Sequence, residues 1–296
     1  MIKKKILIIG SNGFLGHNLS LSLNKLGYKL FLLCKKRDKK KISNAKYLYC
    51  NLSNKKKLKK ILAQDYDFVI NVSGNINHNN KKETNAVHFS YIKNVINILN
   101  KKKIILFIHI GSSLEYGKSK SPQKEITKCK PISYYGKAKY KISKFLMSKK
   151  FSFNVVILRL YQIYGPFQKS NRLIPYVIKN CLKNKSFNCT DGRQYRDFLY
   201  IDDFVNLIIK ILKYKKNKTS IYNVGYGYPF QVKNVINRIK LLIGKGLPKF
   251  GKIEMRKDET KFLFPNLKKI TKKYTWKAKV NLNEGLKKTI AYYVNH

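Results

Sequence analysis

The chain has 296 residues, and its 64 Lys and Arg residues against 14 Asp and Glu give a formal net charge of +50. Apolar residues make up 44% and aromatic residues 13%, which excludes a disordered basic tail, because disorder requires low hydrophobicity as well as high charge. No apolar run approaches the roughly 18 residues that a membrane-spanning helix needs. The length predicts one large domain or two closely packed ones.

The first half of the chain alternates apolar runs with amphipathic segments. The apolar runs predict buried strands at residues 6–9, 29–34, 47–50, 68–72, 104–110 and 155–160. Between them, apolar residues recur at a helical spacing, which predicts helices at residues 16–26, 55–62, 83–100 and 135–148. Strands alternating with helices of this length indicate a parallel sheet with helices on both faces.

After residue 165 this alternation loosens. Helical patterns at residues 172–182, 202–212, 232–243 and 282–294 are separated by turns rich in Gly, Pro and Asn. We therefore predict two domains. A doubly wound α/β domain covers residues 1–165, and a smaller, mainly substrate-binding C-terminal domain covers residues 166–296, from which some segments can return to the first.

The basic residues are almost all Lys. Only seven of the 64 are Arg, and the Lys residues stand in twos and threes between apolar segments along the chain. Nucleic-acid grooves use the planar fork of Arg at some positions at least. We interpret the charge as that of a solvated Lys-rich surface without a specific nucleic-acid site. In such a background, the few Arg and acidic residues mark positions where geometry or charge sign matters.

The cysteines indicate a reducing compartment. They are odd in number and lack metal-ligand spacing, so we expect reduced thiols, no metal site and a cytoplasmic protein. The apolar run at residues 6–9 ends at Gly10, which is too short for the core of an export signal. The five are Cys34, Cys50, Cys129, Cys181 and Cys189.

A glycine-rich motif directly follows the first predicted strand and opens a helix. Such glycines let the backbone approach a pyrophosphate, and a helix N-terminus offers free N–H groups and the positive end of a dipole. The motif predicts a dinucleotide site and makes the sheet a Rossmann-type, doubly wound one. Its spacing is G-x-x-G-x-x-G, and the candidate contacts are Gly10, Asn12, Gly13, Phe14, Leu15 and Gly16.

This spacing is typical of the short-chain dehydrogenase/reductase superfamily, and the chain resembles its extended branch, the nucleotide-sugar epimerases, dehydratases and reductases. The resemblance runs nearly end to end. It rests on ordered segments that include Gly-Ser-Ser-Leu-Glu-Tyr-Gly (111–117), Ser-Tyr-Tyr-Gly-Lys-Ala-Lys (133–139), Leu-Arg-Leu-Tyr-Gln-Ile-Tyr-Gly-Pro (158–166) and Asp-Gly-Arg-Gln-Tyr-Arg-Asp-Phe (191–198). It implies an NAD(P)-dependent enzyme that acts on a nucleoside-diphosphate hexose.

Three residues are expected to carry the chemistry: Ser112, Tyr135 and Lys139. The Tyr-x-x-x-Lys spacing occurs by chance in a chain with 21 Tyr, as Tyr140 and Lys144 show, so position decides. Tyr135 lies at a helix start and Ser112 ends a strand at the edge of the sheet where ligands bind. Lys139 shares a helix face with Tyr135, and a nearby cation favours the phenolate. The resemblance makes Tyr135 the acid/base, Ser112 its partner at the sugar oxygen, and Lys139 also a ligand of the nicotinamide ribose.

Other cofactor contacts are carried over from the family, some with departures. Asn51, before Leu52, stands where the family usually has an Asp near the adenine, which weakens that contact. Asn85 matches a family Asn near the cofactor, although a solvated helix position is equally compatible. At the end of the second strand, Lys35 and Arg37 stand where an acid would select NAD, which favours NADP over NAD, although the Lys-rich background dilutes the signal.

The sugar nucleotide needs cations for its diphosphate. The resemblance assigns this role to Arg196, whose planar fork suits phosphate. Arg256 is the next candidate, although an ion pair with Asp258 or Glu259 explains it equally well. Ser113 and Gln162 are further substrate candidates, and Gln162 is one methylene longer than the Asn often found there.

Hydride transfer at C4 is the expected reaction, and the choice among family reactions turns on residues 113–115. A 4,6-dehydratase needs an extra acid and base where this chain has Ser113 and Leu114. Glu115 is adjacent, but a shift of one residue would point it differently, and an ordinary polar position in the turn is one interpretation of it. We predict a 4-keto-6-deoxy-sugar reductase, with a 4-epimerase as the alternative. A non-catalytic dinucleotide-binding or sensor protein is the rival from another class.

A homodimer is also expected. The predicted helix at residues 83–100 carries more apolar surface than one core-facing stripe needs, and extended family members commonly pair this helix and that at 135–148 into a four-helix bundle.

Overall fold

The computed structural model describes residues 4–36, 41–75, 80–255 and 259–295. Its backbone divides into two units. Unit 1 comprises Met1–Gly117, Lys128–Arg159 and Ile208–Tyr222, and unit 2 comprises Lys118–Thr127, Leu160–Leu207 and Asn223–His296. The units are therefore interleaved along the sequence, and residues 208–222 return to unit 1.

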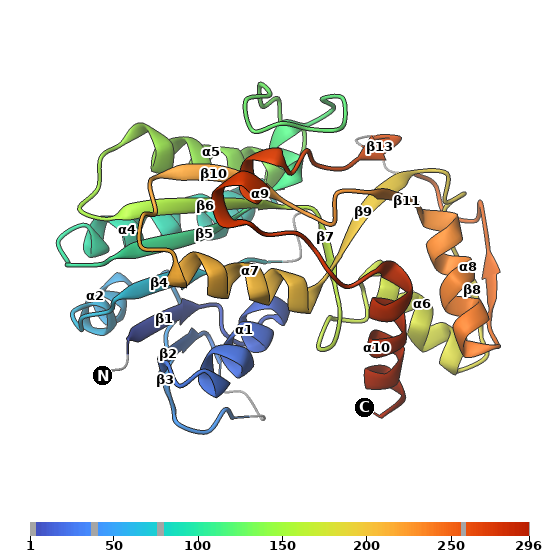
Figure 1. The fold of residues 1–296 in the computed structure, drawn as a ribbon, viewed down its shortest axis with the longest axis horizontal. Helices are drawn as coiled ribbons and strands as arrows, with labels where there is room; N and C mark the ends of the chain where they lie inside the picture. The colour runs from blue at the N-terminus through green and yellow to red at the C-terminus, as the bar shows by residue number, and fades with distance from the viewer. Residues whose placement is uncertain (1–3, 37–40, 76–79, 256–258, 296) are drawn as a thin grey trace. The chain divides into compact units, whose positions relative to one another are not determined.

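Unit 1 is built on a seven-stranded sheet in the order β10-β6-β5-β4-β1-β2-β3 (Figure 1). The pairs from β3 to β5 are parallel. The strand order reverses between β1 and β4, the place where doubly wound sheets bind ligands at their carboxyl ends. The Rossmann-type prediction is confirmed. The strands are β1 (Lys5–Ile9), β2 (Lys29–Cys34), β3 (Ala45–Tyr49), β4 (Phe68–Asn71), β5 (Leu106–Ser112), β6 (Asn154–Leu160) and β10 (Ser220–Val224).

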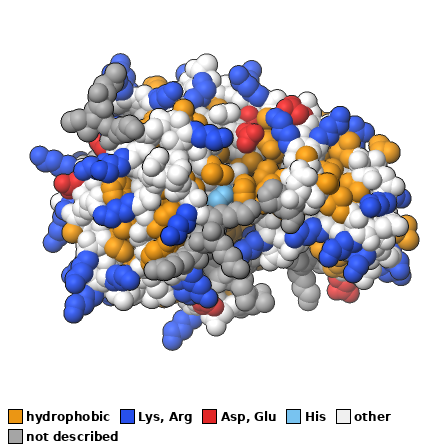
Figure 2. Space-filling view, turned by 90° about the horizontal axis from the view of Figure 1, so that it is seen from below, with side chains coloured by type: hydrophobic (Ala, Val, Ile, Leu, Met, Phe, Trp, Pro, Cys, Tyr) orange, Lys and Arg blue, Asp and Glu red, His pale blue; other side chains and the backbone are white. Residues whose placement is uncertain are grey.

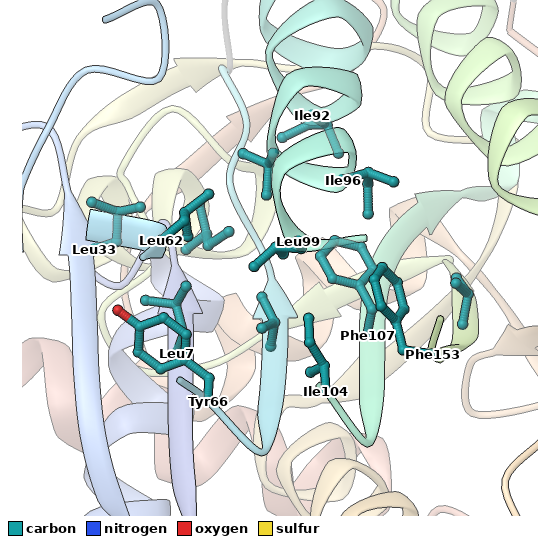
Figure 3. Packing of buried hydrophobic residues seen from close by; sticks show 14 of the residues in the cluster. Leu7, Leu33, Leu62, Tyr66, Ile92, Ile96, Leu99, Ile104, Phe107 and Phe153 are labelled. Atoms are coloured by element: carbon teal, nitrogen blue, oxygen red, sulfur yellow. The ribbon is translucent and has the colours of Figure 1, made fainter. Parts of the chain in front are cut away.

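Alternate residues of the strands supply two cores. One set packs with α2, α4 and α5, and Figure 3 shows Ile92, Ile96 and Leu99 of α4 directed toward the strands that carry Leu7 and Phe107. The opposite set is equally buried, and α1 contacts β1 and β2. Continuous apolar strands follow from burial on both faces. The helices are α1 (Phe14–Lys25), α2 (Lys55–Leu62), α4 (Tyr91–Leu99) and α5 (Tyr134–Ser148).

The helix expected at residues 83–100 is not uniform. It consists of α3 (Lys81–Asn85), a π-helical turn (Ala86–Ser90) and α4. A π-turn inserts an extra residue into the helical period and often marks a functional site. Here the turn contains His88, which is 2% exposed.

Unit 2 contains short strands that the sequence did not predict. One small sheet joins β11, β9 and β13, with β7 on β9, and another joins β12 and β8. The strands are β7 (Gln162–Tyr164), β8 (Ser186–Asn188), β9 (Tyr195–Tyr200), β11 (Pro229–Gln231), β12 (Leu247–Lys249) and β13 (Phe262–Leu263). The helices are α6 (Leu173–Leu182), α7 (Ile201–Lys213, which continues into unit 1), α8 (Val232–Ile243), α9 (Lys268–Tyr274) and α10 (Leu282–Val294).

The surface carries the charge as the composition predicted. Figure 2 shows Lys and Arg side chains spread over the whole of one face, with few acidic ones between them. None of the five cysteines, all of which lie in the described part of the chain, forms a disulfide. Within the described residues, every helix is too short or too polar to cross a bilayer.

Candidate active site

The glycine motif forms a cradle at the end of β1. Gly10 has a φ of +89°, which favours glycine, and its N–H donates to the carbonyl of Leu33 on β2 at 2.8 Å. A Cβ on Gly16 would collide with the Gly10 carbonyl and the Ser11 backbone, so α1 packs against the loop only because residue 16 lacks a side chain. Gly13 caps α1 without a side chain, which leaves N–H groups of the first turn for a ligand. The geometry fits a dinucleotide pyrophosphate.

The residues expected around the adenosine are exposed or partly exposed. The Asn12 amide donates to the Lys36 carbonyl at 2.9 Å, which joins the glycine cradle to the end of β2. Lys35 is exposed there, and Arg37 lies outside the described residues. Asn51 accepts the Ser53 N–H at 3.2 Å, Leu52 is half-buried beside it, and Asn85 is half-buried at the end of α3.

Tyr135 and Lys139 lie on one face of α5. The Lys139 ammonium is 5.8 Å from the centre of the Tyr135 ring and donates to the Ile110 carbonyl of β5 at 2.7 Å. Burial lowers the pKa of Lys139 to about 8, and the charge of Glu115 opposes that shift. The ammonium is therefore held in a buried position next to a phenol. The carbonyl that holds it belongs to the residue two positions before Ser112.

Ser112 ends β5 and is held by its backbone neighbours. Its hydroxyl oxygen accepts the Leu114 N–H at 3.2 Å, which leaves the hydroxyl hydrogen available to donate. Ser113 is buried in the short helix that follows, Ser113–Tyr116. A Cβ on Gly136 would lie 2.5 Å from the Leu114 carbonyl, so the start of α5 packs directly on this turn. The structure thus brings the Ser112 turn, Tyr135 and Lys139 together.

Glu115 is more than an ordinary polar residue of the turn, contrary to the interpretation that its position in the sequence allowed. Its side chain is fully buried: one carboxylate oxygen accepts the Ser112 N–H at 2.9 Å and the other accepts Arg159 Nε at 2.9 Å. Burial lowers the pKa of Arg159, but the negative charges around it, first that of Glu115, raise it by more, so the pKa of Arg159 lies above its ordinary value. The guanidinium carbon also lies 4.6 Å from the centre of the Tyr116 ring. The sequence signal was available, since Arg159 is one of only seven Arg residues.

A cluster of buried polar side chains, which the sequence did not predict, contacts Tyr135. The His88 ring meets the Tyr135 ring edge-on, with centroids 4.9 Å apart. His109 on β5 pairs with the Asn71 amide at 3.0 Å, and Asn71 in turn accepts the Ser73 hydroxyl at 2.6 Å. Burial holds the pKa of His109 well below its ordinary value, with Lys139 and His88 adding to the effect, so His109 is neutral. Only the tertiary contacts identify this cluster, because isolated His and Asn residues carry no sequence signal.

The predicted phosphate ligand Arg196 is buried in unit 2. Its guanidinium forms an ion pair with Glu259 and donates to the backbone carbonyls of Tyr195 and Thr260. Arg256 and Asp258 lie outside the described residues. Among the described residues, Glu259 is the ion-pair partner of Arg196. Gln162 begins β7 and is exposed.

Known proteins resemble the chain over most of its length. Residues 6–225 match the model of the NAD dependent epimerase/dehydratase family. The CDP-abequose synthase of Salmonella muenchen is 26% identical over 98% of both chains. A putative UDP-glucose 4-epimerase of Methanocaldococcus jannaschii is 27% identical over 98% of this chain and 99% of its own. The structure of the UDP-glucose 4-epimerase of Thermotoga maritima with UDP-glucose superposes with a TM-score of 0.91 at 22% identity, covering 98% of this chain and 99% of that one.

Proposed function

The chain belongs to the NAD dependent epimerase/dehydratase family, and within that family we propose that it is a nicotinamide-dependent reductase of a 4-keto-6-deoxy nucleoside-diphosphate sugar. The observation that carries the proposal is the arrangement at the end of β5, where an oriented serine hydroxyl, a phenol and a buried ammonium lie at the same carboxyl edge of the sheet as the glycine cradle, with β4 between them. This set suits proton transfer at a sugar oxygen.

Each of the three residues has a distinct part. The Ser112 hydroxyl, with its oxygen already held by the Leu114 N–H, donates to the sugar oxygen and orients the carbonyl. Tyr135 gives its phenolic proton to that oxygen as the carbonyl becomes a hydroxyl. Lys139 stabilises the phenolate left behind, because an ammonium next to a phenol favours its charged form.

The cofactor would lie on the glycine cradle, with its pyrophosphate at the N-terminus of α1 and its ribose near Lys139. When bound, a reduced nicotinamide supplies the hydride to C4 of the sugar. Lys35 at the end of β2 supports NADP, since a cation there accommodates the 2′-phosphate that an acid would repel.

Glu115 supports reduction over dehydration. Elimination of water across C5–C6 needs a further acid and base beside the phenol. Ser113 and Leu114 occupy those positions, and both oxygens of the neighbouring Glu115 are bonded to Ser112 and Arg159 inside the fold. A carboxylate so held is not available to abstract a proton from a sugar carbon.

A 4-epimerase is the second candidate. The relative from Methanocaldococcus jannaschii is named as one, and an epimerase uses the same three groups. The two reactions differ in stoichiometry, because a reductase consumes one reduced cofactor per turnover whereas an epimerase regenerates its own.

The deciding experiment has two arms, both followed by the nicotinamide absorbance and by product analysis with mass spectrometry and standards for the two epimers. One arm supplies 4-keto-6-deoxy sugars linked to CDP, UDP or dTDP with NADPH or NADH, and the other supplies nucleotide hexoses that carry a C4 hydroxyl without reduced cofactor. Stoichiometric oxidation of the cofactor supports the reductase. Interconversion of 4-epimers without added reduced cofactor moves the assignment to the epimerase, and no turnover of any nucleotide sugar rejects both.

We also propose a homodimer through the outer faces of α4 and α5. The inner face of α4 is used by the core, but Tyr91 of α4 and Val87 of the preceding π-helical turn remain partly exposed. The lysines exposed on α5, such as Lys137 and Lys141, would face like charges in a symmetric pair, so the dimer should tighten with rising salt. Sedimentation at micromolar concentration in low and high salt tests this, and a monomer in both rejects it.

A further inference from the structure

One buried acid in unit 1 has no place in the proposed proton transfer, although it touches the proposed site. Glu115 and Arg159 have side chains that are 0% and 3% exposed, in a chain with only 14 acidic residues. A buried charge pair is costly to desolvate and is not explained by stability alone. Its location at the end of β5 therefore calls for a role at that site.

Two observations connect the carboxylate to Ser112. The first is a reciprocal capping box, in which the Ser112 hydroxyl caps the short helix and the Glu115 carboxylate accepts the Ser112 N–H at 2.9 Å. The second is Gly111, where a Cβ would lie 2.6 Å from the Glu115 carboxylate. The strand end is thus shaped to admit this carboxylate.

Arg159 prevents the carboxylate from moving. It reaches Glu115 from β6, the neighbouring strand in the sheet, and its guanidinium also lies over the Tyr116 ring. The carboxylate is consequently anchored by one strand while it orients the end of the next. A small displacement of a reacting group costs a large factor in rate, so such anchoring has a functional use.

We propose that Glu115, anchored by Arg159, is a positioning residue that holds the Ser112 hydroxyl in place for the sugar oxygen. The inference rests on the proposed function. In this role, the Glu115–Arg159 pair acts on the reaction through Ser112 and does not contact the substrate.

Glu115 has a second measurable influence through its charge. The Lys139 ammonium faces the Ile110 carbonyl, the Tyr135 ring and His109. His88 in turn interacts with His109. Glu115 supplies the negative charge that favours the ammonium. Removal of that charge should lower the pKa of Lys139 further. The alkaline limit of activity should then move to lower pH, which a merely structural residue would not cause.

The test compares kcat, KM, cofactor Kd and the pH profile of wild type, Glu115→Gln, Ser112→Ala and the double variant. We expect Glu115→Gln to lower kcat by roughly 10- to 100-fold, with KM and cofactor Kd nearly unchanged and the alkaline limit displaced downward. In the Ser112→Ala background, Glu115→Gln should have little further effect, because both changes act on the same hydroxyl.

The matched control is Asp203→Asn. Asp203 is also a buried carboxylate that accepts two backbone N–H groups, from Lys279 and Val280, but it lies in unit 2. It should lower the melting temperature without moving the pH profile. If Glu115→Gln behaves in the same way as this control, or if its effect adds fully to that of Ser112→Ala, the inference is overturned.

Gly111→Ala decides the matter if Glu115→Gln does not fold, because it displaces the carboxylate without removing its charge. A lower kcat with an unshifted alkaline limit supports the positioning role, and a wild-type kcat overturns it. Failure of the proposed function is distinguishable, since the wild-type protein would then turn over no nucleotide sugar.

Discussion

Unit 1 and unit 2 each contain a buried arginine paired with a glutamate, and the two pairs have different surroundings. In unit 1, both oxygens of Glu115 are bonded within the fold and the carboxylate is inaccessible. In unit 2, Glu259 is 17% exposed, and the other acceptors of Arg196 are neutral backbone carbonyls. The first pair is closed around a turn, whereas the second holds its arginine, which is itself 5% exposed, beside a carboxylate that solvent partly reaches.

This difference separates chemistry from binding. Substitutions around the end of β5 in unit 1 should act mainly on kcat, because the groups there are proposed to move or hold a proton. Substitutions at Arg196 in unit 2 should act mainly on KM, because that residue is proposed to bind the diphosphate. Measurement of kcat and KM for variants in each unit therefore tests whether the two arginine–glutamate pairs differ in this way.

The largest effect is expected from Tyr135→Phe in unit 1. Only the proton-transferring oxygen is removed, so the variant should fold and bind cofactor while kcat falls about 10²- to 10⁴-fold. Tyr134→Phe is the control, since Tyr134 is the neighbouring tyrosine and its side chain is exposed. Activity of Tyr135→Phe within a few-fold of wild type would assign the proton transfer elsewhere: to Tyr134 if the control variant loses activity instead, and otherwise with Tyr116 next to test.

The corresponding change in unit 2 is Arg196→Lys, which keeps the charge but loses the planar fork. We expect KM to rise by roughly 10-fold or more, with kcat changed only a few-fold, because a bidentate phosphate contact is replaced by a point charge. Arg193→Lys, on an arginine that is 83% exposed, should change neither constant. A fall in kcat at constant KM for Arg196→Lys would contradict the assignment of binding to this residue.

The pH dependence of stability and of activity tests the role of Lys139. Its pKa of about 8 lies below the ordinary 10.5, so between these values the unfolded chain binds more protons than the folded one. This group therefore opposes folding fully below pH 8, and its penalty is relieved as pH rises toward 10.5. Activity should do the opposite and fall about tenfold per pH unit above 8, because the neutral amine cannot stabilise phenolate. A flat rate between pH 8 and 10 in a folded protein would remove Lys139 from the mechanism.

The smallest effect concerns cofactor choice at the end of β2. Lys35→Glu places an acid where it would repel a 2′-phosphate, so the affinity for NADPH relative to NADH should fall several-fold. Lys46→Glu on β3 makes the same change in net charge at another exposed lysine. If both variants shift the ratio equally, the overall positive field is responsible, and Lys35 is not specific.

Most of unit 1 could be predicted because its signals are local. A strand buried on both faces is a continuous apolar run, and each run from residue 6 to residue 160 became a strand of the large sheet. Apart from β9, the strands of unit 2 have only two or three residues, which is too few for such a pattern. β10 joins the large sheet from a distant part of the chain. The glycine cradle was also predictable, since close packing of α1 on Gly10 demands glycine at residue 16.

The sequence by itself determined the doubly wound sheet, the glycine cradle and the presence of Ser112, Tyr135 and Lys139 at their elements, because periodicity and glycine spacing are properties of neighbours along the chain. Tertiary structure alone decided the state of the charged groups. The pairing of Glu115 with Arg159, the pairing of Arg196 with Glu259, and the burial of Lys139 between β5 and Tyr135 each join distant residues. Whether a carboxylate acts as a base or holds a turn depends on which charge the fold places beside it and on how far it excludes water.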